Sequence, residues 1–162
     1  MTDIDYSSYN ELIKKSEDLL KVYPSSLIVV TGRTGVGKTT LARYLAWKVQ
    51  VSLIETDLFL CNNEDEQKHD AECIREILAR KRNMGQSVII EGCIATAILH
   101  DLGIEYDFLV YVERQQSTKI NSLSRDPFFC ENTTRQVLDP SVFGSSLHHS
   151  DSRKKADFIV SI

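Results

Sequence analysis

The stretch Gly32-Arg33-Thr34-Gly35-Val36-Gly37-Lys38-Thr39 is a complete match to the phosphate-binding P-loop pattern G-x-x-x-x-G-K-[ST]. In such a loop, successive backbone N–H groups surround the β-phosphate of a nucleotide, and glycine permits backbone angles that bulkier residues resist. We expect the Lys38 ammonium to reach the β- and γ-phosphates and the Thr39 hydroxyl to bind Mg²⁺. The motif therefore predicts a nucleotide di- or triphosphate as the ligand.

The flanking sequence places this loop between a strand and a helix. Residues 26–31 form a short, apolar, β-branched run, and Leu41, Leu45 and Val49 recur every four residues from Thr40 onward. Strand, glycine loop and helix are the context that the motif requires, and the positive end of the helix dipole favours a bound anion. The predicted nucleotide-binding residues are Gly32, Arg33, Thr34, Gly35, Val36, Gly37, Lys38, Thr39 and Thr40.

Composition limits the class of protein. The 162 residues are 42% hydrophobic and 26% charged, which is typical of a single domain with a full core, so we treat residues 1–162 as one domain. The net charge of −4 argues against a broad nucleic-acid surface, which needs a basic patch. The polar, acidic N-terminus and the lack of a long apolar run argue against a signal peptide and a membrane span. The four cysteines form no C-x-x-C pair, which indicates reduced thiols and a cytoplasmic location. Composition leaves the oligomeric state open.

Strand and helix patterns alternate along the rest of the chain. This alternation predicts parallel β-α-β units with right-handed crossovers, and hence an α/β fold. The expected helices are 6–23, 64–84, about 94–100 and 115–124, and the further expected strands are 51–56, 87–90, 106–112 and 158–162.

Two acidic residues follow predicted strands. Loops after the strands of a parallel sheet open on one edge, where ligands bind, so we expect Asp57 and Glu91 to lie near the P-loop. Glu91 ends the buried run that starts at Val88 and would lie beside Mg²⁺ or the acceptor, whereas Asp57 suits a general base that takes a proton from an acceptor hydroxyl. Glu91 could instead be simply an acid in a loop after a strand, and Asp57 could be a helix or turn cap.

These segments resemble the uridine kinase and phosphoribulokinase group of P-loop kinases over residues 26–162. The resemblance is carried by Thr56-Asp57-Leu58-Phe59, by Val88-Ile89-Ile90-Glu91-Gly92-Cys93-Ile94-Ala95, by Arg125-Asp126 and by Lys155-Ala156-Asp157-Phe158-Ile159-Val160.

The resemblance implies a P-loop NTPase fold, a three-layer α/β sandwich around a five-stranded parallel sheet of order 2-3-1-4-5. It implies ATP and Mg²⁺ as cofactors and a small-molecule hydroxyl, such as that of a nucleoside or a sugar, as the acceptor. It makes Lys38, Asp57 and Arg125 the catalytic residues, with Arg125 a lid charge in a lid-like region at about 114–155. It assigns the metal to Thr39 and Glu91.

Other functions are weighed by their own signatures. A nucleoside monophosphate kinase would need arginines on the acceptor side, and the Asp-Gly-x-Pro-Arg type of signature is absent after the third predicted strand. A GTPase would need Asn-Lys-x-Asp to read guanine, and the sequence has none. A noncatalytic nucleotide sensor that keeps the P-loop remains open.

Two further polar groups have simpler interpretations. Arg75, Arg80 and Arg82 in the helix expected over 64–84 could receive an anionic acceptor, but a solvated helix face is the simpler interpretation. His148-His149 with Asp151 lacks the spacing of a closed zinc site and indicates a polar loop.

Overall fold

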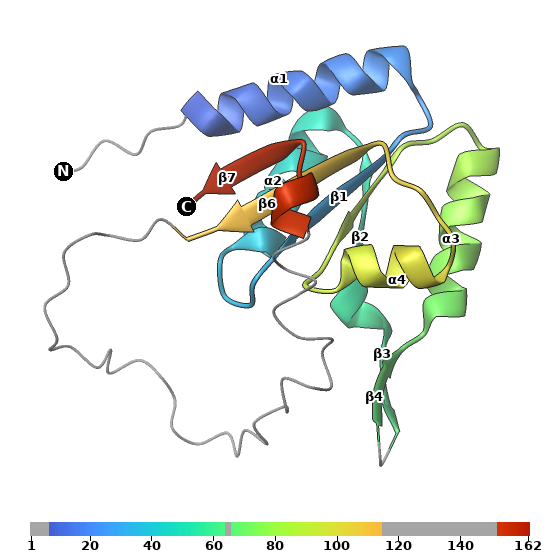
Figure 1. The fold of residues 1–162 in the computed structure, drawn as a ribbon. Coiled ribbons are helices and arrows are strands. Elements are labelled where there is room, and N and C mark those ends of the chain that lie inside the picture. Colours follow the sequence, from blue (N-terminus) through green and yellow to red (C-terminus); the bar gives the residue numbers. More distant parts are fainter. Residues whose placement is uncertain (1–6, 64–65, 115–151) are drawn as a thin grey trace, which may run out of the picture.

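A five-stranded parallel sheet forms the centre of the structure, a computed structural model that describes residues 7–63, 66–114 and 152–162 (Figure 1). The strands lie in the order β2-β5-β1-β6-β7, and every neighbouring pair is parallel. Their bounds are β1 (Leu27–Gly32), β2 (Ser52–Glu55), β5 (Val88–Glu91), β6 (Phe108–Glu113) and β7 (Phe158–Ser161). Numbered among themselves along the chain, these strands have the order 2-3-1-4-5, which confirms the predicted sheet.

Helices cover both faces of this sheet and complete the predicted three-layer sandwich (Figure 1). Their bounds are α1 (Ser7–Val22), α2 (Lys38–Val49), α3 (Ala71–Asn83) and α4 (Ala95–Asp101), with a further helical turn over residues 152–155. Helices α1 and α2 pack on one face, and α3 and α4 pack on the other. Within the described parts of the chain, none of the helices has the length and apolar character needed to cross a membrane.

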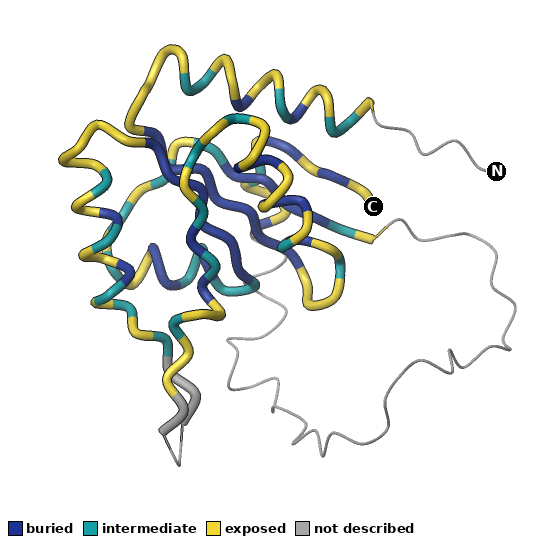
Figure 2. Tube along the Cα trace, turned by 180° about the vertical axis from the view of Figure 1, so that it is seen from behind, coloured by how far each residue is buried: buried dark blue, intermediate teal, exposed yellow. Residues whose placement is uncertain are grey.

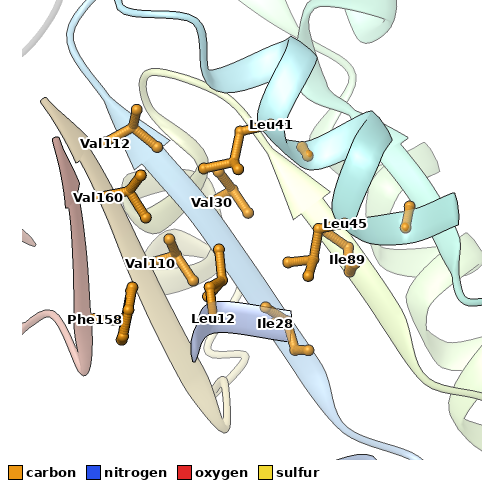
Figure 3. Close-up of a cluster of buried hydrophobic side chains, with 12 residues drawn as sticks. Leu12, Ile28, Val30, Leu41, Leu45, Ile89, Val110, Val112, Phe158 and Val160 are labelled. Atoms are coloured by element: carbon orange, nitrogen blue, oxygen red, sulfur yellow. The ribbon is translucent and has the colours of Figure 1, made fainter. Parts of the chain in front are cut away.

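The central strand β1 is buried on both faces, as the dark strands in the middle of Figure 2 show. Because successive side chains of a strand point to opposite faces, its residues divide between two cores. Ile28 and Val30 meet Leu12 of α1 and Leu41 and Leu45 of α2 in the first core (Figure 3). The second core joins the intervening β1 residues to α3 and α4; its members include Leu27, Val29, Ile74, Leu78, Ile98 and Leu99.

Side chains at the starts of the strands fix the register of the sheet. The backbone N–H of Leu27 donates to Asp107 Oδ2 at 2.8 Å, and that of Leu109 donates to Asp157 Oδ2 at 2.7 Å. These bonds tie β1, β6 and β7 together at their amino ends. The opposite ends of the strands, which carry the P-loop and the acidic residues, are therefore aligned along one edge.

The helix predicted over 64–84 begins later than expected. Its start is wrong because β3 (Leu60–Asn63) and β4 (Glu66–His69) pair as an antiparallel hairpin that projects from the body of the fold (Figure 1). The helix α3 begins only after Asp70, whose carboxylate accepts a hydrogen bond from Cys73 N at 2.9 Å as an N-cap. Its end agrees with the prediction, since Gly85 N donates to Arg82 O as a C′ residue does.

The second predicted strand also ends earlier than expected. Strand β2 stops at Glu55, and Asp57 lies in the 3₁₀ turn η1 (Thr56–Phe59) that follows it. The other predicted elements agree with the structure to within two residues at most of their ends. The predicted helix 115–124 lies outside the described residues, as do Arg125, His148, His149 and most of the lid-like region 114–155.

Candidate functional site

The P-loop turns sharply from β1 into α2. Gly35 and Gly37 have φ angles of 77° and 91°, which L-residues with side chains rarely adopt. Gly37 occupies the N-cap position of α2 and offers no side-chain acceptor, so the first N–H groups of the helix are left without a capping partner. Backbone donors of this kind, at the positive end of a helix dipole, suit a phosphate group.

The start of the loop is pressed against the neighbouring strand β6. Gly32 has a φ angle of 150°, and a methyl group on its Cα would overlap the carbonyl oxygen of Val112 and lie 3.1 Å from the carbonyl carbon. Glycine is therefore required here by space as well as by backbone angle.

Lys38 lies in the loop with its ammonium held close to the backbone. Its side chain is buried, with a residue exposure of only 6%. Its Nζ donates to the carbonyl oxygen of Arg33 at 3.1 Å and lies 4.0 Å from Glu91 Oε1. A phosphate that enters the loop would replace these two partners with a closer negative charge.

Glu91 lies at the end of β5 and is almost fully buried, with 2% exposure. Burial raises the pKa of Glu91, while the positive charge of Lys38 and the neighbouring Thr39 hydroxyl oppose this rise. The negative charges of Asp57 and Glu55 add to the increase. The predicted metal pair, Thr39 and Glu91, is thus brought together beside Lys38.

Asp57 lies at the same edge but is exposed to solvent. Its carboxylate is near enough to Glu91 and to His69 for its charge to act on the pKa of both side chains. The structure therefore places Lys38, Thr39, Glu91 and Asp57 around one edge of the sheet, as the sequence predicts. Thr40 and the loop residues Arg33 and Thr34 are exposed.

The fit of a metal ion can be judged from these donors. Among the described residues, no three Cys, His, Asp or Glu side chains converge as a closed metal site. Mg²⁺ keeps several waters and needs only one or two protein oxygens beside the phosphates. A hydroxyl from Thr39 and a buried carboxylate from Glu91 fit that requirement.

An ion pair beside the site was not anticipated from the sequence. Arg43 Nε and Nη2 donate to the two carboxylate oxygens of Glu55 at 2.6 and 2.8 Å, and Arg43 holds the pKa of Glu55 below its ordinary value. Glu55 is the register partner of Glu91 on the neighbouring strand. The spacing of Thr39 and Arg43, one helical turn apart, was the available signal that both face the strand ends.

The arginines of α3 serve a different part of the molecule. Arg75 and Arg82 line a pocket of about 250 Å³ whose floor includes Leu27 and Val88. These two residues start β1 and β5, so the pocket lies at the amino edge of the sheet. Arg75 and Arg82 therefore lie at the edge of the sheet opposite to the P-loop.

Comparisons with known proteins agree with this fold. A family model described as "ATPase family associated with various cellular activities (AAA)" matches residues 28–90, the segment from β1 to β5. A solved structure described as a possible uridine kinase from Bacillus stearothermophilus is similar with a TM-score of 0.55 and 14% identity, covering 93% of this chain and 98% of that one.

A weaker likeness, with a TM-score of 0.41 and 15% identity, is to the hydrogenase maturation factor HypB from Archaeoglobus fulgidus, over 96% of this chain and 89% of that one. No curated protein sequence matches the chain significantly. The family model and the possible uridine kinase structure confirm the P-loop NTPase fold and, at the level of fold, the resemblance to the uridine kinase group.

Proposed function

We propose that the chain is an ATP-dependent phosphotransferase that moves the γ-phosphoryl group to a hydroxyl of a small molecule, such as a nucleoside or a sugar. The observation that carries this proposal is the meeting of three groups at one edge of the sheet. Lys38 is buried in the P-loop, Glu91 is buried beside it, and Asp57 stands exposed at the same edge. A nucleotide clamp, a metal-side acid and a free carboxylate are the parts that phosphoryl transfer needs.

The roles of the loop residues follow from their positions. Backbone N–H groups of Gly35 to Lys38 would surround the β-phosphate, and the Lys38 ammonium would leave Arg33 O and Glu91 for the phosphate oxygens. Thr39 and Glu91 would hold Mg²⁺, Thr39 directly and Glu91 directly or through water. Bound Mg²⁺ would neutralise charge that develops on the phosphoryl oxygens.

Asp57 is proposed as the general base. Its exposure allows an acceptor hydroxyl to approach, whereas Glu91 is enclosed and close to Lys38. A carboxylate accepts a proton only when it is ionised, so exposure to water also suits this role.

Arg125 remains a prediction as the lid charge. The unpaired thiols Cys61, Cys73 and Cys93 support a reducing, cytoplasmic setting.

The experiment that tests this function measures ADP formation from ATP with a panel of small hydroxyl compounds, with and without Mg²⁺. We expect one chemical class of acceptor to increase turnover well above the acceptor-free rate, and only with Mg²⁺. ATP binding without transfer to any acceptor would contradict the proposal and favour the noncatalytic sensor. Phosphorylation of nucleoside monophosphates alone would favour the other kinase alternative.

A further inference from the structure

Two buried polar atoms without a hydrogen-bond partner belong to residues near Asp57. Three buried side-chain atoms of the described residues have no hydrogen-bond partner: Ser16 Oγ, Thr56 Oγ1 and His69 Nε2. Ser16 lies in α1, away from the site, whereas Thr56 precedes Asp57 and His69 lies near it. Buried groups of this kind are rare in folded proteins and call for a functional or structural explanation.

His69 is fixed in place at the base of the hairpin. It ends β4 and is the register partner of Leu60, the first residue of β3. The next residue continues the attachment, because Asp70 N donates to Phe59 O at 2.7 Å. Phe59 ends η1, the turn that carries Asp57. The hairpin therefore fixes the backbone of His69 next to the turn that carries the proposed base.

The electrostatics of His69 favour a neutral ring. Burial lowers the pKa of His69, and the negative charge of Asp57 acts in the opposite direction. A neutral imidazole carries one N–H donor and one acceptor nitrogen. The Asp57 carboxylate has no hydrogen bond or ion pair with the described side chains. His69 Nε2 and the Asp57 carboxylate oxygens are therefore both available to form a hydrogen bond with each other.

We propose that His69 is a positioning residue for Asp57: when the acceptor occupies the site, His69 Nε2–H donates to one carboxylate oxygen of Asp57. The other oxygen is then left free to accept the proton of the acceptor hydroxyl. This inference rests on the proposed function, since it assigns His69 a part in orienting the base of that reaction. The step moves no proton to or from His69, which stays neutral throughout.

The hydrogen bond would orient the base. It would fix the rotation of the carboxylate, so that one oxygen faces the γ-phosphate side. This orientation predicts a loss of transfer rate, not of nucleotide affinity, when His69 is removed.

A nuclear magnetic resonance titration tests the juxtaposition without any activity. The imidazole Cε1–H signal of His69 in the full chain is assigned by its loss in His69→Gln and is followed with pH in wild type and Asp57→Asn. We expect a lower pKa for His69 in Asp57→Asn, because the carboxylate that raises it is gone. Glu105→Gln, at the opposite edge of the sheet, is the control and should leave the titration unchanged. Identical curves for wild type and Asp57→Asn would overturn the inference.

A double-mutant cycle then tests the positioning role. We expect His69→Ala to lower transfer at saturating acceptor about tenfold or more with unchanged Mg·ATP affinity, whereas His69→Gln, which keeps a terminal N–H donor, retains most of the rate. In the Asp57→Asn background, His69→Ala should cause little additional loss. An equal loss in both backgrounds would overturn the positioning role, and circular dichroism excludes unfolding as its cause.

The titration and the transfer assays distinguish a failure of this inference from a failure of the proposed function. A wild type that transfers to no acceptor would refute the proposed function, while the titration would still show whether His69 and Asp57 are neighbours. Active transfer with an unchanged His69 titration in Asp57→Asn would refute the positioning role and leave the proposed function standing.

Discussion

Replacing Gly32 by alanine tests how closely the P-loop approaches strand β6. At this position φ is 150°, and the added methyl group would overlap Val112 O, with Val112 C at 3.1 Å and Val112 N at 3.3 Å. All three neighbours are backbone atoms, which cannot rotate away as a side chain can. Either the loop or β6 must therefore move to accommodate the methyl group.

The loss of stability in Gly32→Ala can be estimated by comparison with the same substitution at Gly35. A carbon atom and a carbonyl oxygen normally stay about 3.3–3.6 Å apart, so relief of the overlap needs a backbone shift of about 1 Å. Overpacking of this kind costs about 1–3 kcal/mol, and the unfavourable φ adds about 1 kcal/mol. Gly35, with a φ angle of 77°, has nothing within 4 Å of an added methyl group, so Gly35→Ala should cost only about 1–2 kcal/mol.

Urea unfolding of the two variants measures the difference. We expect Gly32→Ala to lose about 1–2 kcal/mol more than Gly35→Ala, which at a slope of about 2 kcal/mol per molar separates their midpoints by about 0.5–1 M. Equal midpoints for the two variants would refute the argument that the approach to Val112 limits this position.

Four residues of the site and its surroundings give further tests. Lys38→Ala should weaken MgATP binding in calorimetry and abolish transfer without unfolding the chain; unchanged affinity and turnover would disprove the role of the P-loop. Thr39→Ala should raise the Mg²⁺ concentration needed for activity more than Glu91→Gln does, and a normal Mg²⁺ titration of Glu91→Gln would remove that residue from the metal site. Arg43→Ala should lower the urea midpoint at pH 7. Arg43 lowers the folded-state pKa of Glu55 below 4.5, so this stability is present above that value and is lost as the pH falls through the lowered pKa. A loss that persists undiminished at pH 3 would contradict the ion-pair explanation.

The sheet and the loop could be predicted because their signals are local. The P-loop pattern fixes the turn after β1, and the apolar strands alternating with helices fix the parallel connections. The position of Asp57 and Glu91 at one edge then follows from the geometry of parallel sheets. The exact end of β2 could not be predicted from the sequence, because the chain continues after it as the turn η1 and not as a strand.

The hairpin and the ion pair could not be predicted in the same way. The acidic residues 64–66 have the pattern of the first turn of a helix, which led to the prediction of a helix from residue 64. The pairing of β3 with β4 and the N-cap at Asp70 instead place the start of α3 after Asp70. Arg43 reaches Glu55 because α2 packs against β2 and β5. The isolated Nε2 of His69 likewise depends on three-dimensional packing, which a pattern along the chain does not contain.

The measurement that tests the proposed phosphotransfer most directly compares wild type with Asp57→Asn, a change that keeps the size of the side chain and removes its charge. We expect nearly unchanged MgATP affinity by calorimetry and a fall in the rate of transfer to the best acceptor of about a hundredfold or more. A stable Asp57→Asn protein that binds MgATP and transfers at the full wild-type rate would contradict the proposed mechanism.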